Sequence, residues 1–419
     1  MKFYATVALS AALGVGAAFG GEDLRPAERP ASETDDWSGD WCAPLKNSLG
    51  LKAEGVEPWL WDVRMFGRLQ FQYEHVDGTD ANDKHFDYDT TEVRRFYLGG
   101  QARFLNYFQL IGRAVMENDR TPLRGNHEWG YEGLWDLGVM TDLKKMLGVG
   151  GVDSLALGYG KKQVNVSGEW HTSSKFIQTV ERSAIANYVW PRTTGSSNPT
   201  GVWVDVAKGD WKATAGVFTT DHSAEFGEWD DGVMCYAEVF RGFDHPSAWV
   251  PTRMNLAGFW QDVDAMDEKL TGGMEWVTSL SGDWEAGPWT IHGNVMVGDN
   301  GDQAADRDGM FWGVVVMPSI TLIPDKLDFV ARYQYAGARE DEGIRLWSRY
   351  SRRAEAVDPG VDINGGRGDE HHNIYLGLTC YICDSNLKLM TGVEYDDLSS
   401  GGQSVYEGWT ASVAVRTYF

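Results

Sequence analysis

The sequence has little of three things: long apolar runs, basic charge and cysteine. Beyond the N-terminus, polar residues recur every few positions, so no apolar run reaches the roughly 18–20 residues of a membrane-spanning helix. There are 37 basic and 61 acidic residues, for a net charge of −24, and no basic field would attract a nucleic acid. Four cysteines in 419 residues are too few for a disulfide scaffold. These shortages exclude a helical membrane protein, a nucleic-acid partner and a cystine-rich fold.

Glycine and aromatic residues are abundant, and the N-terminus has the features of an export signal. The chain has 50 Gly and 19 Trp, and this aromatic content argues against disorder. Lys2 precedes an apolar stretch over residues 7–19, and residues 18–20 form a small-x-small cleavage site. We expect residues 1–20 to be a signal peptide that directs the chain to an oxidising compartment.

Residues 21–58 contain four prolines among acidic residues and do not alternate. We interpret them as a periplasmic N-terminal extension or plug-like segment that precedes a β domain over residues 59–419. Near the other end of the chain, Cys380 and Cys383 would lie about 10 Å apart on opposite faces of an extended segment. We therefore do not expect them to be bonded to each other, and the sequence leaves their redox state open.

Alternation with a period of two residues dominates the rest of the sequence. Near residue 63, Met65 and Phe71 fall on one face, while Arg68 and Glu74 fall on the other. Sixteen strands are predicted, at residues 63–75, 92–104, 107–118, 133–141, 154–161, 201–207, 211–219, 233–242, 252–261, 271–280, 289–298, 310–321, 326–335, 371–381, 386–396 and 408–419.

The predicted connections are short at one end of the strands and long at the other. Short turns include residues 105–106 and 384–385, and long connections include residues 76–91 and 162–200. This asymmetry, with alternating apolar and polar faces, is typical of an all-β transmembrane antiparallel β-barrel of the bacterial outer membrane. A soluble β-sandwich or propeller is the alternative.

Aromatic residues at the strand ends support the barrel. Several tryptophans lie near predicted strand ends, as expected for the aromatic girdles of a membrane barrel: Trp129, Trp135, Trp203, Trp211, Trp276, Trp289, Trp312 and Trp409. The last strand presents an apolar face and ends at Phe419, which is similar to the terminal signal of bacterial outer-membrane barrels.

The sequence resembles the phosphate-selective porin O and P family. The resemblance is carried by residues 93–100, 113–117, 157–162, 173–175, 180–183, 201–202, 375–378, 386–388 and 393–395. It implies a trimeric outer-membrane channel whose sixteen-stranded barrel holds an inward-folded third extracellular loop, here residues 162–200. Gln163, Val164 and Asn165 stand where the family often has a proline.

A diffusion channel requires an aqueous lumen and a constriction. The charges of the constriction must bind a solute weakly enough that it can enter and leave. Strand faces and loop positions indicate these pore-lining, anion-binding candidates: Arg68, Arg95, Arg103, Arg113, Lys161, Lys175, Arg182, Arg192 and Arg332. Arg95, Arg113 and Arg182 lie in the segments of resemblance. For each of them, pairing with a lumen carboxylate is the alternative role.

We expect an outer-membrane porin for small hydrophilic solutes, with anions such as phosphate as candidates. The partners expected are the lipid bilayer, lipopolysaccharide, small ions and two further copies in a homotrimer. A general or cation-tolerant porin, an adhesive or structural barrel and a hydrolytic barrel remain alternatives. No enzyme motif is complete, and we expect no catalytic residue, cofactor or metal. Adjacent His371 and His372 would face opposite sides of a strand, which disfavours a metal site there.

Overall fold

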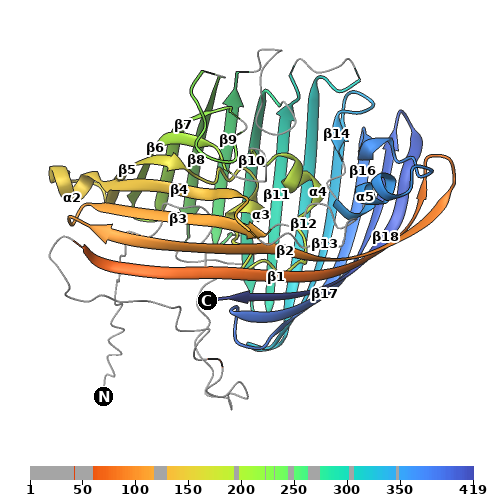
Figure 1. Cartoon of the computed structure of the whole chain (residues 1–419), viewed down its shortest axis with the longest axis horizontal. Helices are drawn as coiled ribbons and strands as arrows, with labels where there is room; N and C mark the ends of the chain where they lie inside the picture. The colour runs from red at the N-terminus through yellow and green to blue at the C-terminus, as the bar shows by residue number, and fades with distance from the viewer. Residues whose placement is uncertain are drawn as a thin grey trace.

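The chain folds into a closed antiparallel barrel (Figure 1). The structure is a computed structural model and describes Cys42 and residues 60–117, 130–192, 198–221, 223–230, 232–243, 250–262, 274–301, 306–345 and 349–419. The predicted signal peptide, the N-terminal extension apart from Cys42, and Trp129 lie outside these residues.

Sixteen strands close the barrel, as predicted, which excludes an open sandwich or a propeller. They are β1 (Leu60–Asp80), β2 (His85–Phe104), β3 (Phe108–Glu117), β4 (Gly133–Asp142), β5 (Ser154–Lys161), β6 (Thr200–Lys208), β7 (Trp211–Thr219), β8 (Val233–Gly242), β9 (Arg253–Gln261), β10 (Trp276–Ala286), β11 (Trp289–Asp299), β12 (Met310–Ile323), β13 (Leu327–Ala338), β16 (Glu370–Tyr381), β17 (Leu387–Ser400) and β18 (Gln403–Tyr418). Two short strands, β14 (Ile344–Arg345) and β15 (Arg367–Gly368), form a separate sheet.

Alternation decides which side chains face the lumen. In β1, Phe71 and Tyr73 are exposed on the outer face, whereas Gln72 and Glu74 are buried inside the barrel. The outer surface is lined with large apolar side chains, including Leu256, Leu280, Val295, Val316, Ile374, Leu376 and Val413. An apolar outside and a polar inside match a barrel that crosses a bilayer, and the predicted face assignment of β1 is confirmed.

Tight turns close one end of the barrel. Leu105 and Asn106 have φ values of 50° and 62°, and Asp325 and Asp384 have φ values of 60° and 51°. Asn and Asp tolerate this left-handed region because their short polar side chains bond locally, and it suits tight hairpin turns. The predicted turns at residues 105–106 and 384–385 are confirmed.

The first hairpin is longer than predicted. The expected long loop over residues 76–91 is wrong, because β1 and β2 remain paired as far as Thr79 and His85. A turn over residues 81–84 joins them, in which Asp80 Oδ1 accepts hydrogen bonds from the backbone of Asn82 and Lys84. Both faces of this outer part carry polar residues, so the alternation that marks a strand in the sequence is lost there.

Strands β1 and β18 pair at the seam that closes the barrel. The pairing runs from Arg68 opposite Tyr418 to Asp80 opposite Tyr406. Beyond that register, Gly67 and Phe419 exchange backbone hydrogen bonds of 2.9 and 3.2 Å. A Cβ on Gly67 would lie 2.4 Å from the Phe419 ring, so the terminal ring covers this glycine. The last residue of the chain is therefore part of the closure.

The tryptophans divide between the two sides of the wall. On the strands, those exposed to the outside include Trp211, Trp260, Trp289, Trp312 and Trp409. The predicted girdle positions of Trp135 and Trp203 are wrong, because both side chains are buried, with 4% and 1% exposure. Their strands turn these positions inward, and the bulky rings fill the lumen wall.

The helices are short and lie in connections: α2 (Leu143–Leu147), α3 (Gly168–His171), α4 (Ala184–Tyr188), α5 (Arg349–Val357) and the 3₁₀ turn η5 (Asn364–Gly366). Within the described residues, no helix has the length and apolar character needed to cross a bilayer. In Figure 1, α2 and α5 lie at opposite ends of the barrel wall. Lys84 Nζ pairs with Asp358 Oδ2 at 2.8 Å, which ties the segment after α5 to the tip of the first hairpin.

Gly160 marks the point where the chain turns away from the end of β5. Its φ is 131°, and a Cβ at this position would lie 2.2 Å from the carbonyl oxygen of Leu137. Only glycine combines this backbone conformation with so close an approach to a neighbouring strand.

Gly160→Ala is therefore expected to lower the thermal unfolding temperature of the folded barrel, because both the backbone angle and the contact with Leu137 become strained. The measurement is the heat-dependent gel shift of the purified protein in detergent. Gly242→Ala is the control, since a Cβ there meets nothing within 4 Å. Equal unfolding temperatures for the two variants would contradict the prediction.

Candidate pore constriction

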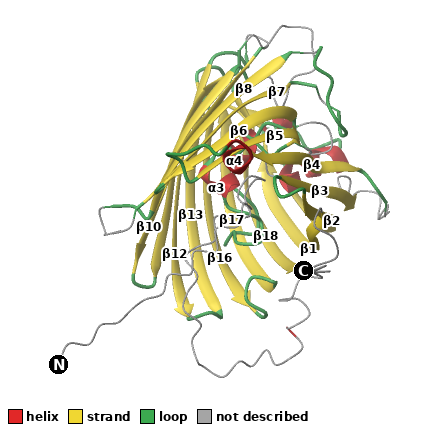
Figure 2. Cartoon of the chain, turned by 90° about the vertical axis from the view of Figure 1, so that its left-hand side faces the viewer, coloured by secondary structure: helices red, strands yellow, loops and turns green. Residues whose placement is uncertain are grey.

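The described part of the connection between β5 and β6 lies inside the barrel. We call residues 162–192 of this connection L3; they include α3 and α4 (Figure 2). Gly168 N donates to Asn294 Oδ1 on β11 at 2.9 Å, and Ile185 N donates to Gln334 Oε1 on β13 at 2.9 Å. Contacts with strands that are distant in the sequence show that L3 narrows the lumen.

Side chains of the wall satisfy the backbone of L3. Thr379 Oγ1 donates to the carbonyl of Gln178 at 2.9 Å, and Val180 N donates to the Tyr375 hydroxyl at 3.2 Å. Arg416 donates to the carbonyl of Val180. A buried backbone group without a partner costs about 1–3 kcal/mol, so these bonds fix the path of L3 across the lumen.

An aromatic stack anchors L3 to the wall. The rings of Trp170 and Trp190 stack with centroids 3.9 Å apart. Trp135 of β4 lies 5.5 Å from Trp190 and 5.0 Å from Tyr97 of β2. All four rings are buried, and together they join the two ends of L3 to β2 and β4.

Arg182 is held by L3 itself. Its Nε and Nη2 donate to the carbonyls of Glu169 and Thr172 at 2.9 and 2.7 Å, and its guanidinium lies 4.0 Å from the centroid of the Trp170 ring. The next residue, Ser183, caps α4 by accepting from Ala186 N, and Ser183 N donates to a Glu169 carboxylate oxygen at 3.1 Å. These bonds leave Arg182 little rotational freedom.

Four basic side chains along L3 donate to neutral oxygens, and we call Arg95, Arg182, Arg416 and Lys388 the basic cluster. Arg95 Nη1 donates to Gln70 Oε1 at 2.8 Å, and Lys388 Nζ donates to the carbonyl of Ile177 at 2.6 Å. Arg416 donates to the carbonyls of Ser174 and Val180. Burial and the charges of Arg95 and Arg416 lower the pKa of Arg182 to about 9, so it remains a cation at neutral pH.

Glu181 is the acidic counterpart in L3. Its carboxylate accepts from Arg94 Nε at 2.6 Å and from Arg94 Nη2 at 3.2 Å, and Gln72 Nε2 donates to it at 3.0 Å. Burial by itself raises the pKa of Glu181, but the positive charges of Arg94, Arg95 and Arg416 outweigh burial and lower the pKa well below its ordinary value. Glu181 therefore stays ionised at neutral pH.

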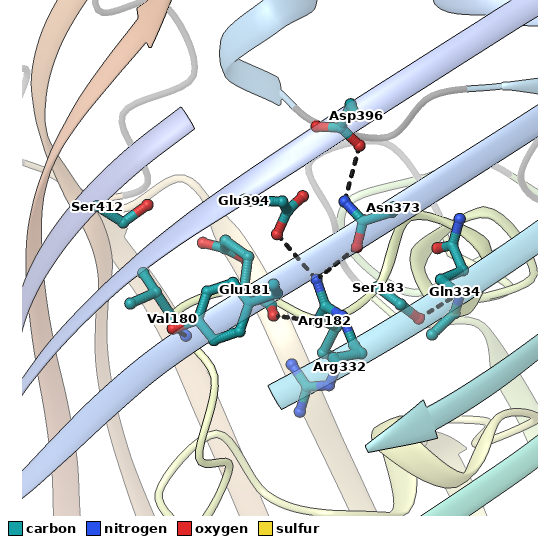
Figure 3. A network of polar contacts seen from close by, with 12 residues as sticks. Val180, Glu181, Arg182, Ser183, Arg332, Gln334, Asn373, Glu394, Asp396 and Ser412 are labelled. Carbon is teal, nitrogen blue, oxygen red and sulfur yellow. Dashed lines mark hydrogen bonds and ion pairs between the residues drawn. The ribbon is translucent and has the colours of Figure 1, made fainter. Parts of the chain in front are cut away.

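Arg332 joins L3 to the opposite wall (Figure 3). Its Nη2 donates to Glu394 Oε2 at 2.8 Å, and its Nη1 donates to the carbonyl of Glu181 at 2.8 Å. Asn373, which also contacts Arg332, donates to Asp396 Oδ1 at 2.8 Å. The predicted pore-lining Arg332 is buried and balanced by carboxylates, which gives it a positioning role.

Arg113 departs from the role that the sequence suggested. Its guanidinium forms a two-pronged pair with Asp136 on β4, with Nε at 3.0 Å from both carboxylate oxygens, and both side chains are buried. Arg113 therefore has the alternative role named above, which is pairing with a lumen carboxylate.

Three other candidates contact backbone carbonyls or aromatic rings. Lys161 Nζ donates to the carbonyls of Ser223, Ala224 and Glu225, and so holds the connection after β7. Lys175 lies 5.9 Å from the Tyr418 ring, and Arg192 lies 5.6 Å from the Trp190 ring.

Two candidates on the first strands differ. Arg68 lies beside L3, where its Nη1 donates to Ser174 Oγ at 2.7 Å. Arg103 is only half buried, near the turn between β2 and β3.

Sequence reasoning missed Arg416 and Lys388, which contact L3 directly. The signal that could have found Arg416 was present, because alternation from Trp409 to Val415 places it on the lumen face of the last strand. Register then pairs Arg416 with Lys388 on β17.

The described residues contain no group of three or more His, Cys, Asp or Glu side chains placed to hold a metal ion. His371 is buried, with Nε2 2.9 Å from Asp396 Oδ1, whereas His372 lies on the outer face beside Tyr333. The expected opposite orientation of the two histidines is confirmed.

Comparison with known protein families identifies the barrel. Residues 63–232 match the family model described as phosphate-selective porin O and P, over the strands and the loop that carry Arg95, Arg182 and Glu181. Over these residues, the chain is similar to this porin family. No curated protein matches it.

Solved structures similar to this porin share its fold. OprB of Pseudomonas putida is 11% identical, with a TM-score of 0.54 over 84% of this chain and 94% of that one. An anion-selective porin from Comamonas acidovorans is 12% identical, with a TM-score of 0.53 over 85% and 99% of the two chains. OmpT of Vibrio cholerae is 12% identical, with a TM-score of 0.51 over 85% and 98%. The porin is an outer-membrane barrel.

The Glu181 contacts predict a pH dependence of stability. Because the pKa of Glu181 is lowered in the folded porin, its ion pair contributes full stability above its ordinary value of 4.5. The contribution is lost as pH falls from that value through the lowered pKa. Glu181→Gln should reduce the unfolding temperature by a constant amount above about pH 5.5, roughly one unit above that value, and the difference should shrink below about pH 4. If the difference in unfolding temperature between Glu181→Gln and the wild type were the same at pH 3 and pH 7, this assignment would be contradicted.

Removing Arg113 is expected to affect stability and to leave ion selectivity unchanged. Arg113→Ala leaves the Asp136 charge buried without its partner, which costs about 3–5 kcal/mol. Urea unfolding of the refolded porin measures this loss, and the double variant Arg113→Ala/Asp136→Ala should recover part of it. If the double variant were no more stable than the single one, the pair would not be the cause.

Proposed function

We propose that this porin is a passive diffusion channel whose constriction favours small anions. The observation that carries the proposal is the position of Arg182, which lines a cavity beside L3 together with Arg94, Glu181, Tyr375 and Glu394. The other charged groups of that cavity are balanced in pairs, because Arg94 bonds Glu181 and Glu394 bonds Arg332. Arg182 donates to carbonyls and adds positive charge to the passage.

Anion passage follows from how the basic cluster is held. A guanidinium has five N–H donors, and the two carbonyl bonds of Arg182 use two of its nitrogens. Remaining donors can replace part of the hydration shell of an anion with charge-assisted hydrogen bonds, while Arg95 and Arg416 add positive potential nearby. An anion that binds these fixed cations does not first have to displace a carboxylate from them. It can therefore both enter the constriction and leave it.

Phosphate is the anion that the family resemblance suggests, and chloride and small carboxylates share the chemistry that this site would bind. The alternative function is a general or cation-tolerant pore, since Glu181 and Glu394 line the same cavity. We also propose that the protein acts without catalysis, assembles as a homotrimer, as the resemblance implies, and contacts lipopolysaccharide through its outer rim.

Measurement of single channels in planar bilayers tests the proposal. The purified porin should insert in conductance steps, and its reversal potential in a KCl gradient should show preference for chloride. Inorganic phosphate should block part of the chloride current. A silent bilayer would remove the channel assignment, and a reversal potential of the opposite sign would favour the cation-tolerant pore.

Two substitutions should move the selectivity in opposite directions. One unit charge about 5 Å from the ion path changes the energy of an ion by about 0.8 kcal/mol in water-like surroundings. Arg182→Gln should therefore reduce the chloride-to-potassium permeability ratio by about fourfold or more. Glu181→Gln should raise this ratio, because it removes a negative charge from the same cavity.

Arg339→Gln is the matched control, since it removes one positive charge from a side chain that is 77% exposed beside Glu340, after the end of β13. Its permeability ratio should equal that of the wild type. Equal ratios for Arg182→Gln and Arg339→Gln would exclude Arg182 from the selective part of the passage.

A further inference from the structure

A disulfide bond links the segment before the first strand to a turn near the last one. Cys42 and Cys383 are bonded, with their Cα atoms 5.6 Å apart and a separation of 341 positions in the sequence. Cys42 precedes β1, and Cys383 lies in the turn that joins β16 to β17. The cysteines expected not to bond each other, Cys380 and Cys383, are indeed not joined, and Cys380 is free.

This bond crosses the closing seam of the barrel. The strand order around the seam is β16, β17, β18 and then β1, and only hydrogen bonds and side-chain packing join β18 to β1. The covalent ring from Cys42 to Cys383 contains β1 to β13 and β16, which are fourteen of the sixteen barrel strands. β17 and β18 are the two strands outside it, and they fill the gap between its ends.

Contacts around Cys383 place the bond at the end of the barrel where the seam begins. Asn386, three residues after Cys383, exchanges hydrogen bonds with the backbone of Tyr418 at 2.8 and 3.1 Å. Tyr418 in turn pairs with Arg68 across the seam. The exposures of Cys42 and Cys383 are 1% and 0%, so the bond is shielded from thiols in solution.

We propose that the Cys42–Cys383 disulfide is a redox-formed staple that keeps the two edges of the closing seam together. Two thiols are oxidised, and they lose two protons and two electrons. A disulfide-bearing periplasmic thiol oxidant accepts the electrons and is reduced to its dithiol. Joining residues this far apart restricts the unfolded chain strongly, so the staple stabilises the closed barrel. The proposal is independent of which ions the channel passes.

Peptide mapping of the protein purified from membranes tests the bond itself. Proteolysis without reductant should give a peptide pair that joins Cys42 to Cys383, and reductant should separate it. Cys235 on β8 and Cys380 on β16 should be found as free thiols. Absence of the linked pair in the wild-type porin would overturn the proposal, whatever the variants do.

Thermal unfolding tests the role of the bond. Cys42→Ser, Cys383→Ser and the double variant should lose the heat-resistant band several degrees below the wild type, and the double variant should fall no further than either single one. Reductant present during heating should bring the wild type to the same temperature and leave the variants unchanged. Cys235→Ser and Cys380→Ser are controls that should behave as the wild type. Wild-type unfolding temperatures in the double variant would show that the bond does not hold the seam.

Discussion

The interior of this barrel is organised by one constraint: a loop that leaves the wall and enters the lumen must have its backbone polar groups satisfied there. L3 has no sheet to pair with, so side chains from the wall bond its amides and carbonyls. Each such bond specifies both a wall residue and a point on the loop. The shape of the passage follows from these bonds, and the aromatic stack of Trp135, Trp170 and Trp190 supports them.

The same constraint determines where positive charge remains available. Carbonyl groups of L3 accept from Arg182 and Arg416 and carry no net charge, so they hold these two side chains in place without cancelling their positive charges. Elsewhere in the lumen, cations are held by carboxylates, as in the pairs of Arg113 with Asp136 and of Arg332 with Glu394. In the proposed anion channel, the type of partner, more than the number of basic residues, separates the groups that a passing ion can use from those that stabilise the wall.

Much of the fold could be predicted from the sequence, because a strand between lipid and water must alternate. The sixteen strands, the tight turns and the lumen face of β1 followed from that rule. The rule failed at the outer half of the first hairpin, where both faces are polar, and at Trp135 and Trp203, whose bulk suggested the lipid boundary. Within the site, Arg182 was predicted, whereas the partner of Arg113 depends on register between strands, which one sequence does not reveal.

The last hairpin has a second consequence. β17 and β18 carry Lys388, Glu394 and Arg416, so the strands that complete the cylinder also bring in much of the polar lining around L3. Without them, L3 lacks the donors for the carbonyls of Ile177 and Val180. The closure of the wall and the completion of the constriction around L3 therefore depend on the same two strands.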